Sequence, residues 1–340
     1  MVGTMIMVGQ VVGKNMSRRS EINFCPLWGY GGNMKNGVYV AICYICNEKC
    51  SFCPCTKREK LEQKIVNVKS LFFLFKQLQE QHCMQITISG GEPTLHPNFI
   101  EIISFAQKCG MYVTVLSNGE NFANNAFVNE IKKCIDITKL RIITTLHSSI
   151  PEKHELVNKS KGSFHKSVAG LKNMYELGAK IEIKHCITKE NIRQLEQFYL
   201  YCDNEFPENV NIQFCGIDYV GIEKKQLEKA FLSSEDIKEQ LENTFDLYLN
   251  KRKHGSKRHL YAINIPLCAC DVYYWKLMSL KKDIVYEGYA DPYSNNLMEA
   301  ERNVAVSEKY CRECKAYEIC NGTYKTAFDY FGERLVKPYL

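Results

Sequence analysis

The sequence lacks any run of about 18 uncharged apolar residues, the length that a membrane-spanning helix requires. It also lacks the feature order of a secretory signal peptide. Lys14, Arg18 and Arg19 follow the apolar residues 1–10 instead of preceding them, and no small-residue cleavage site is found. No internal repeat or low-complexity segment occurs. These absences predict a soluble globular protein in the cytoplasm, with no membrane as a partner.

A strong excess of one charge is missing as well, because the net charge is only +6 and is spread along the chain. Residues 251–253 and the pair Lys257–Arg258 form the one local basic cluster. We interpret it as a solvated loop, with a phosphate or nucleic-acid contact as the alternative. An apolar content of 45% in 340 residues provides a core for one large α/β barrel with a smaller module, or for two ordinary domains.

Cysteine is abundant by contrast. The chain has 17 cysteines, an odd number that excludes complete intramolecular pairing. In the absence of a secretory signal, their close spacings indicate metal binding in a reducing compartment rather than disulfides.

From about residue 37 onward, apolar strand-like runs alternate with amphipathic helical stretches, the pattern of βα units around a parallel sheet. The predicted strands are 38–44, 85–89, 112–116, 140–146, 181–186 and 210–214. The predicted helices are 68–81, 98–108, 127–134, 164–177, 192–203 and 234–253. We expect an α/β fold with a partial (β/α)6 TIM-type barrel, whose catalytic groups lie at the carboxyl ends of the strands. The expected parts are an N-terminal extension (1–36), the barrel (37–232), a linking helix with the basic loop (233–258) and a small C-terminal module (259–340).

Three cysteines, Cys46, Cys50 and Cys53, follow the first predicted strand within eight residues. Thiolates are the usual protein ligands of iron–sulfur clusters, and three of them leave one iron of a cubane open for chemistry. The alternative is a zinc knuckle, for which Cys43 or Cys55 would supply the fourth thiolate.

Two short motifs follow the next two predicted strands. Gly90, Gly91 and Glu92 precede Pro93, so that two glycines allow a close approach to the backbone beside a carboxylate. Ser117 and Asn118 precede Gly119 on a tight turn. Each motif alone is a common turn, but their order predicts that both lie at the same rim as the cysteine loop.

Together with Phe52 before the last cysteine, these motifs resemble the radical S-adenosylmethionine superfamily over residues 37–217. The resemblance implies that the three thiolates hold a [4Fe–4S] cluster, whose fourth iron is chelated by the amine and carboxylate of S-adenosylmethionine. It also implies that Glu92 and the backbone of Gly90 and Gly91 hold the ammonium. Ser117 and Asn118 would then hold the ribose or the carboxylate.

The resemblance further implies that one electron, from a reductase such as flavodoxin or ferredoxin, splits the sulfonium. The resulting 5′-deoxyadenosyl radical abstracts a hydrogen atom from the substrate. His147 and His185, at or near strand ends, are candidates to face the substrate, and Lys184 and Asn191 are candidates for adenosine contact. The alternative for each histidine is a structural role.

Near the C-terminus, Cys311, Cys314 and Cys320 have a spacing that brings three thiolates around one metal, and Cys268 or Cys270 upstream offers a fourth. The pattern resembles the SPASM and twitch modules of the superfamily. A full SPASM module carries a further cysteine where only Tyr324 is near, so we expect one auxiliary [4Fe–4S] cluster. A four-thiolate structural zinc is the alternative.

The resemblance favours an enzyme that modifies ribosomally made peptides or proteins by a crosslink or an oxidation. Residues 15–36 would then help to bind a leader peptide, or form an unstructured lead-in. One alternative is a small-molecule oxidoreductase or cyclase in cofactor or natural-product biosynthesis. A second is an RNA-modifying protein that uses the basic cluster, with affinity that falls steeply with salt.

Overall fold

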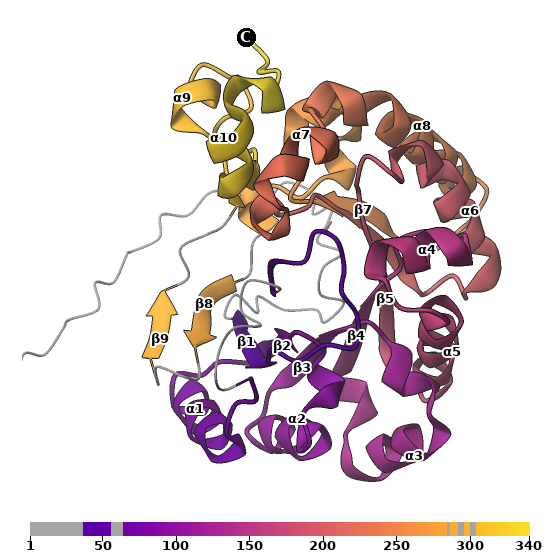
Figure 1. Cartoon of the computed structure of the whole chain (residues 1–340), viewed down its shortest axis with the longest axis vertical. Helices are drawn as coiled ribbons and strands as arrows, with labels where there is room; N and C mark the ends of the chain where they lie inside the picture. Colours follow the sequence, from indigo (N-terminus) through magenta and orange to yellow (C-terminus); the bar gives the residue numbers. More distant parts are fainter. Residues whose placement is uncertain (1–36, 56–63, 284–285, 292–295, 300–303) are drawn as a thin grey trace, which may run out of the picture.

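The computed structural model describes residues 37–55, 64–283, 286–291, 296–299 and 304–340. The predicted N-terminal extension, including residues 15–36, lies outside these ranges. A curved sheet has the strand order β7-β6-β5-β4-β3-β2-β1-β8-β9, and helices cover its outer side (Figure 1). Its strands are β1 (Gly37–Cys43), β2 (Gln85–Gly90), β3 (Tyr112–Ser117), β4 (Leu140–Thr145), β5 (Lys180–Cys186), β6 (Asn211–Cys215), β7 (Leu260–Ile263), β8 (Tyr286–Asp291) and β9 (Asn296–Glu299).

Neighbouring strands from β1 to β7 are all parallel, β8 pairs parallel with β1, and β9 pairs antiparallel with β8. The predicted α/β fold with a partial barrel is therefore confirmed. The six predicted strands are all present, with ends shifted by at most one residue. Strands β7 and β8 continue the sheet beyond residue 259, where we expected a separate module to begin, and the domain boundaries stay predictions.

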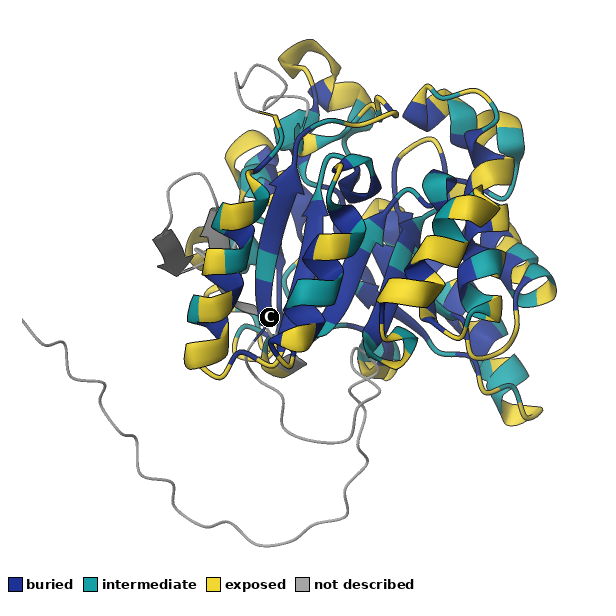
Figure 2. Cartoon of the chain, turned by 90° about the horizontal axis from the view of Figure 1, so that it is seen from below, coloured by how far each residue is buried: buried dark blue, intermediate teal, exposed yellow. Residues whose placement is uncertain are grey.

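The helices are α1 (Val68–Glu80), α2 (Phe99–Lys108), α3 (Asn125–Cys134), α4 (Pro151–Asn158), α5 (Ser163–Glu176), α6 (Leu195–Glu205), α7 (Leu227–Ala230), α8 (Ser234–Lys253), α9 (Glu308–Cys311) and α10 (Lys325–Phe331). Strands β1 to β7 are largely buried on both faces, and the helices expose their outer faces (Figure 2). This explains why the strands read as continuous apolar runs. A small antiparallel pair, β10 (Val304–Ala305) and β11 (Thr323–Tyr324), lies in the C-terminal part. None of the described helices combines the length and apolar composition needed to cross a bilayer.

Polar side chains fill the barrel toward the amino ends of its strands. The buried guanidinium of Arg141 on β4 forms an ion pair with Glu182 on β5. Glu182 Oε1 also accepts hydrogen bonds from Tyr261 Oη at 2.6 Å and from Gln213 Nε2 at 3.0 Å. This network occupies one end of the barrel, so the opposite end, where the carboxyl ends of the strands meet, remains for a functional site.

Arg258 does not belong to a solvated loop, and the interpretation from sequence was wrong for this residue. Its side chain is fully buried and donates to Asp203 Oδ1 at 3.1 Å, to the carbonyl of Phe206 at 2.6 Å and to that of Val210. Lys251 pairs with the same aspartate. The positive charges of Lys251 and Arg258 therefore tie α8 and the segment that follows it to α6, and they lower the pKa of Asp203 against the opposing effect of burial.

Arg258→Met is expected to lower the free energy of unfolding by about 3–5 kcal/mol, because it removes one partner of a buried ion pair and leaves two carbonyls without donors. Lys257→Met, at the exposed neighbouring position, is the control, with an expected change within about 0.5 kcal/mol. Urea unfolding measures both. Equal midpoints for the two variants would contradict the structural role.

Candidate active site

Cys46, Cys50 and Cys53 lie on the loop that follows β1, at the carboxyl end of the barrel. Within the loop, the N–H of Cys53 donates to the carbonyl of Cys50 at 3.1 Å, and the N–H of Glu48 donates to Cys46 Sγ at 3.4 Å. A backbone N–H directed at a sulfur suits a metal-bound thiolate. That all three cysteines bind a cluster stays a prediction.

The two further cysteines considered for a zinc knuckle are engaged elsewhere. Cys43 Sγ is buried and donates to the carbonyl of Glu92 at 3.2 Å, and Cys55 Sγ donates to the carbonyl of Gly90 at 3.0 Å. Both thiols thus contact the backbone of the Gly-Gly-Glu motif. This arrangement favours three cysteine ligands over four.

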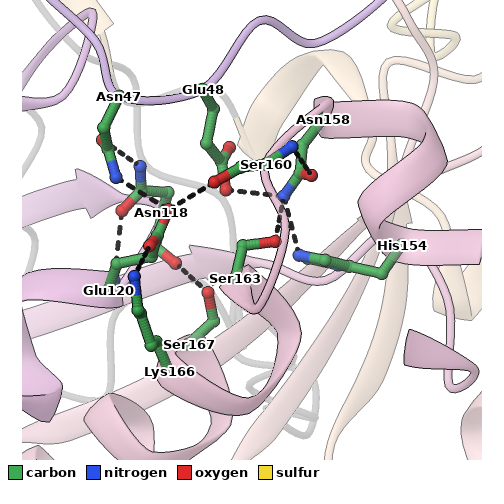
Figure 3. A network of polar contacts seen from close by, with 10 residues as sticks. All are labelled: Asn47, Glu48, Asn118, Glu120, His154, Asn158, Ser160, Ser163, Lys166 and Ser167. Atoms are coloured by element: carbon green, nitrogen blue, oxygen red, sulfur yellow. Dashed lines mark hydrogen bonds and ion pairs between the residues drawn. The ribbon is translucent and has the colours of Figure 1, made fainter. Parts of the chain in front are cut away.

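Helix α4, which the sequence analysis did not predict, holds the cysteine loop in place. The N–H groups of Lys49 and Ser51 donate to the carbonyls of Asn158 and Val157 at 2.8 and 3.0 Å. Asn158 Nδ2 donates to Glu48 Oε1 at 2.7 Å (Figure 3). The last carbonyls of a helix have no partner within that helix, so the end of α4 can accept hydrogen bonds from the N–H groups of the cysteine loop.

A second line of contacts joins the loop to the turn after β3 and to α5 (Figure 3). Asn47 Nδ2 donates to Glu120 Oε1 at 2.7 Å, and Asn118 Nδ2 donates to Asn47 Oδ1 at 2.8 Å. Ser167 Oγ donates to the Asn118 carbonyl at 2.6 Å, and Lys166 forms an ion pair with Glu120 at 3.2 Å. The amide of Asn118 therefore contacts the cysteine loop directly.

Glu92 connects the second motif with the third. Its buried carboxylate accepts hydrogen bonds from Ser117 Oγ at 2.8 Å, from the Asn118 N–H at 2.7 Å, and from the N–H and hydroxyl of Thr94 at 3.0 and 2.5 Å. Burial raises the pKa of Glu92, and these hydrogen bonds oppose the rise. The three predicted motifs thus form one hydrogen-bonded unit, in which Glu92 positions Ser117 and Asn118.

Gly90 and Gly91 allow the loops after β1 and β2 to touch. A Cβ atom at Gly90 would lie 1.9 Å from the carbonyl oxygen of Cys43, and one at Gly91 would lie 2.2 Å from that of Ile45. The N–H of Gly91 donates to the Cys43 carbonyl, and the N–H of Glu92 to the Ile45 carbonyl, both at 2.8 Å. No other residue type fits so close a backbone approach.

Gly91→Ala is expected to destabilise the fold by about 1–3 kcal/mol and to lower iron incorporation, because the new methyl group must push the cysteine loop away. The control is Gly178→Ala, which places a side chain at φ +99° and meets only Ile137 Cγ2, at an ordinary contact distance of 3.8 Å. It is expected to cost about 1–2 kcal/mol without loss of iron. Because the two stability losses are similar, iron content after anaerobic reconstitution distinguishes a local effect on the loop from general destabilisation. Equal iron in both variants would contradict the argument.

The two candidate histidines have different surroundings. His147, two residues after the end of β4, is buried and points its Nε2 at Cys50 Sγ from 3.8 Å, with the ring of Phe52 edge-on at 5.6 Å. Burial, and the nearby His154, lower its pKa, which favours the neutral imidazole. His185 contacts the Leu146 carbonyl at 2.9 Å and packs in the barrel wall. His147 therefore lies at the cysteine loop, and His185 has the structural position.

Asn191 also has a structural position, since its amide donates to the carbonyls of Cys186 and His147 at 2.9 and 3.2 Å. Sequence reasoning missed Cys186 and Cys215, which are register neighbours at the ends of β5 and β6. Asn264 Nδ2 lies 3.7 Å from Cys215 Sγ and 2.9 Å from Tyr324 Oη.

A hydrogen bond from Cys186, together with the charge of Lys184, lowers the pKa of Cys215 against the effect of burial. These groups lie at the strand ends, near the same rim. Period-two alternation along each strand was the available signal, since it places Lys184 and Cys186 on one face.

Four of the five C-terminal candidate cysteines, Cys268, Cys311, Cys314 and Cys320, line one cavity. Cys320 Sγ accepts hydrogen bonds from the N–H groups of Leu267 and Gly322 at 3.4 and 3.3 Å. Cys270 is buried outside this cavity lining, and its carbonyl accepts from Tyr339 Oη at 2.6 Å. The structure thereby brings Cys268, and not Cys270, to the other three.

The spacing of these four thiols bears on which metal they suit. Within the described part of the chain, no three of them lie within 4.8 Å of one another. Thiolates on one tetrahedral zinc, at about 2.3 Å from the ion, are about 3.8 Å apart. The cavity is therefore too wide for a single zinc ion without a rearrangement, and a polynuclear cluster fits its donor set better.

Residues 40–202 match the model of the Radical SAM superfamily. The chain is 27% identical over 172 residues to an S-adenosylmethionine-dependent nucleotide dehydratase of Flammeovirga pacifica, covering 48% of this chain and 58% of that protein. It is 27% identical over 158 residues to the mycofactocin maturase MftC of Mycobacterium tuberculosis, covering 46% and 38%. The chain thus spans less than two thirds of either relative.

The fold is similar to that of Streptococcus suis SuiB bound to its precursor peptide SuiA, with a TM-score of 0.51 and 17% identity, covering 64% of this chain and 46% of SuiB. This likeness concerns the fold alone. The resemblance inferred from the sequence motifs is confirmed at the level of the superfamily.

Proposed function

Because residues 40–202 belong to the Radical SAM superfamily, a superfamily of enzymes, we propose that this chain cleaves S-adenosylmethionine and uses the resulting 5′-deoxyadenosyl radical to remove a substrate hydrogen atom. One observation supports this most strongly: the three motifs meet at one rim and are joined through Glu92 and Asn118. In this proposal Cys46, Cys50 and Cys53 hold a [4Fe–4S] cluster, which supplies the electron that breaks the C–S bond. The donor of that electron would be a flavodoxin or ferredoxin.

The residues around the cysteine loop would bind and orient the cofactor. We assign the ammonium to Glu92 and the backbone of Gly90 and Gly91, and the ribose or carboxylate to Ser117 and Asn118. Glu92 already accepts from four donors, so its larger contribution is to fix the turn that presents Ser117 and Asn118. Phe52 and His147 close the side of the loop and exclude water.

We also propose one auxiliary [4Fe–4S] cluster on Cys268, Cys311, Cys314 and Cys320. The shared cavity, the wide sulfur spacing and the N–H groups directed at Cys320 support it. Such a cluster would bind substrate or accept the electron left after hydrogen abstraction.

For the substrate, we propose a ribosomally made peptide or a protein, modified by a crosslink or an oxidation. MftC is a maturase, and SuiB binds a precursor peptide. The similarity to a nucleotide dehydratase makes a small molecule the second candidate for the substrate. The RNA alternative loses support because Lys251 and Arg258 of the basic cluster are engaged with Asp203.

The test is anaerobic incubation of reconstituted protein with dithionite, S-adenosylmethionine and candidate precursor peptides. We expect 5′-deoxyadenosine, and a peptide product lighter by two hydrogens. A reaction without peptide and one without dithionite are the controls. Formation of 5′-deoxyadenosine with no change in any peptide, but with conversion of a nucleotide, would overturn the substrate assignment and leave the radical chemistry intact.

A further inference from the structure

Glu48, Cys50 and His147 form a compact group of metal-ligating side chains. Their ligand atoms all lie within 4.8 Å of one another, and no other group of three does so in the described ranges. Cys50 Sγ lies 3.4 Å from Glu48 Oε2 and 3.8 Å from His147 Nε2. Two residues come from the cysteine loop and the third from the end of β4.

These distances suit one tetrahedral metal ion. With metal–ligand lengths of about 2.3 Å to sulfur and about 2.0–2.1 Å to oxygen and nitrogen, neighbouring ligand atoms are about 3.5 Å apart. A carboxylate and a thiolate together carry two negative charges, which a divalent ion neutralises in a site where unpaired charges are costly. Thiolate, imidazole and carboxylate are all ordinary zinc ligands.

His147 provides a second, independent indication. The residue is 3% exposed, and its Nε2 makes only the long contact with Cys50 Sγ at 3.8 Å. A buried ring nitrogen whose one polar contact is so long calls for an explanation, and an ion between Nε2 and Cys50 Sγ supplies one.

A second layer of residues holds Glu48 in its orientation. Asn158 Nδ2 donates to Glu48 Oε1 at 2.7 Å, which leaves Oε2 directed at Cys50. Asn158 is itself within 2.9 Å of His154 Nε2 and 2.8 Å of Ser163 Oγ (Figure 3). Support of a ligating carboxylate by neighbouring hydrogen bonds is typical of metal sites.

We propose that Glu48, Cys50 and His147 bind one zinc ion when the iron–sulfur cluster is absent. The ion leaves a fourth tetrahedral position for water. Because Cys50 is shared, zinc and the cluster exclude each other. The zinc-bound chain is therefore a separate state that must release its metal before the cluster forms.

The test uses the full chain, metal-free and reduced, with Cys311→Ser and Cys314→Ser to weaken the other thiolate cavity. Zinc affinity is measured by competition with a chromophoric chelator, and cobalt(II) reports geometry through its thiolate charge-transfer and tetrahedral d–d absorption. We expect His147→Gln to weaken zinc binding by at least about 100-fold and to lose the tetrahedral cobalt spectrum. A loss of this size exceeds the effect of about 10- to 100-fold that is typical of a residue that only hydrogen-bonds to a metal ligand. His165→Gln, an exposed histidine on α5, should leave both unchanged.

Cys46→Ala separates this site from the cluster: it should retain zinc while failing to assemble a cubane. Loss of zinc in Cys46→Ala would show that the three cysteines bind it, and would overturn the proposal. So would an unchanged cobalt spectrum in both His147→Gln and Glu48→Gln, the second variant guarding against misfolding of the first. Zinc preloading should also slow cluster reconstitution in the parent chain but not in Glu48→Gln. None of these measurements depends on cleavage of S-adenosylmethionine.

Discussion

The triple variant Cys46→Ala/Cys50→Ala/Cys53→Ala is expected to form no 5′-deoxyadenosine above the protein-free background. Without these thiolates no cluster can assemble beside the Gly-Gly-Glu and Ser-Asn-Gly motifs, so no electron reaches the sulfonium. Under the two-cluster proposal, iron after anaerobic reconstitution should fall from about eight to about four per chain. Iron analysis and chromatography of the nucleoside products measure the two effects.

The matched control is Cys134→Ala, which removes an exposed free cysteine at the last residue of α3, outside all three motifs. It should retain the iron and the nucleoside product of the parent chain. If the triple variant still produced 5′-deoxyadenosine, the proposed role of the loop would fail. Retention of about eight irons in the triple variant would place both clusters elsewhere.

The barrel was predictable because its strands and most of its helices are long, strongly patterned segments. The six expected helices all occur, with ends shifted by at most three residues. Helix α8 has the predicted bounds, and Ser233 and Asp236 form a capping box at its N-terminus. Helix α4 was not predicted because its eight residues, Pro151–Asn158, are mostly polar and bury only a few side chains. Strand β7 is four residues long, too short to show periodicity.

The candidate site was predictable to the extent that residue type and position relative to a strand determine which residues lie at the rim. That reasoning placed the three motifs at one rim, but it could not show that Glu92 would be saturated by Ser117, Asn118 and Thr94. Contacts of this kind depend on how loops from different units pack. The buried position of Arg258 has the same origin, because Asp203 lies 55 residues away in sequence.

The same limit applied to Cys268 and Cys270, which are separated by one residue. Spacing alone offers both as ligands, whereas the structure places only Cys268 in the cavity with Cys311, Cys314 and Cys320. The turn at residues 267–269 ends at Cys270 in an extended conformation, which separates the directions of the two side chains. This difference makes the pair a matched test of the auxiliary site.

Cys268→Ala is expected to lower iron from about eight to about four per chain and to abolish the substrate product, while Cys270→Ala retains both. Formation of 5′-deoxyadenosine should survive in Cys268→Ala, because the cluster that cleaves S-adenosylmethionine lies on the other loop. This split separates an auxiliary cluster from general unfolding, which would abolish the nucleoside as well. Metal analysis decides the identity of the group: about four irons plus one zinc in a parent chain that still forms 5′-deoxyadenosine would refute the auxiliary cluster. Equal losses in Cys268→Ala and Cys270→Ala would refute the assignment of the fourth ligand.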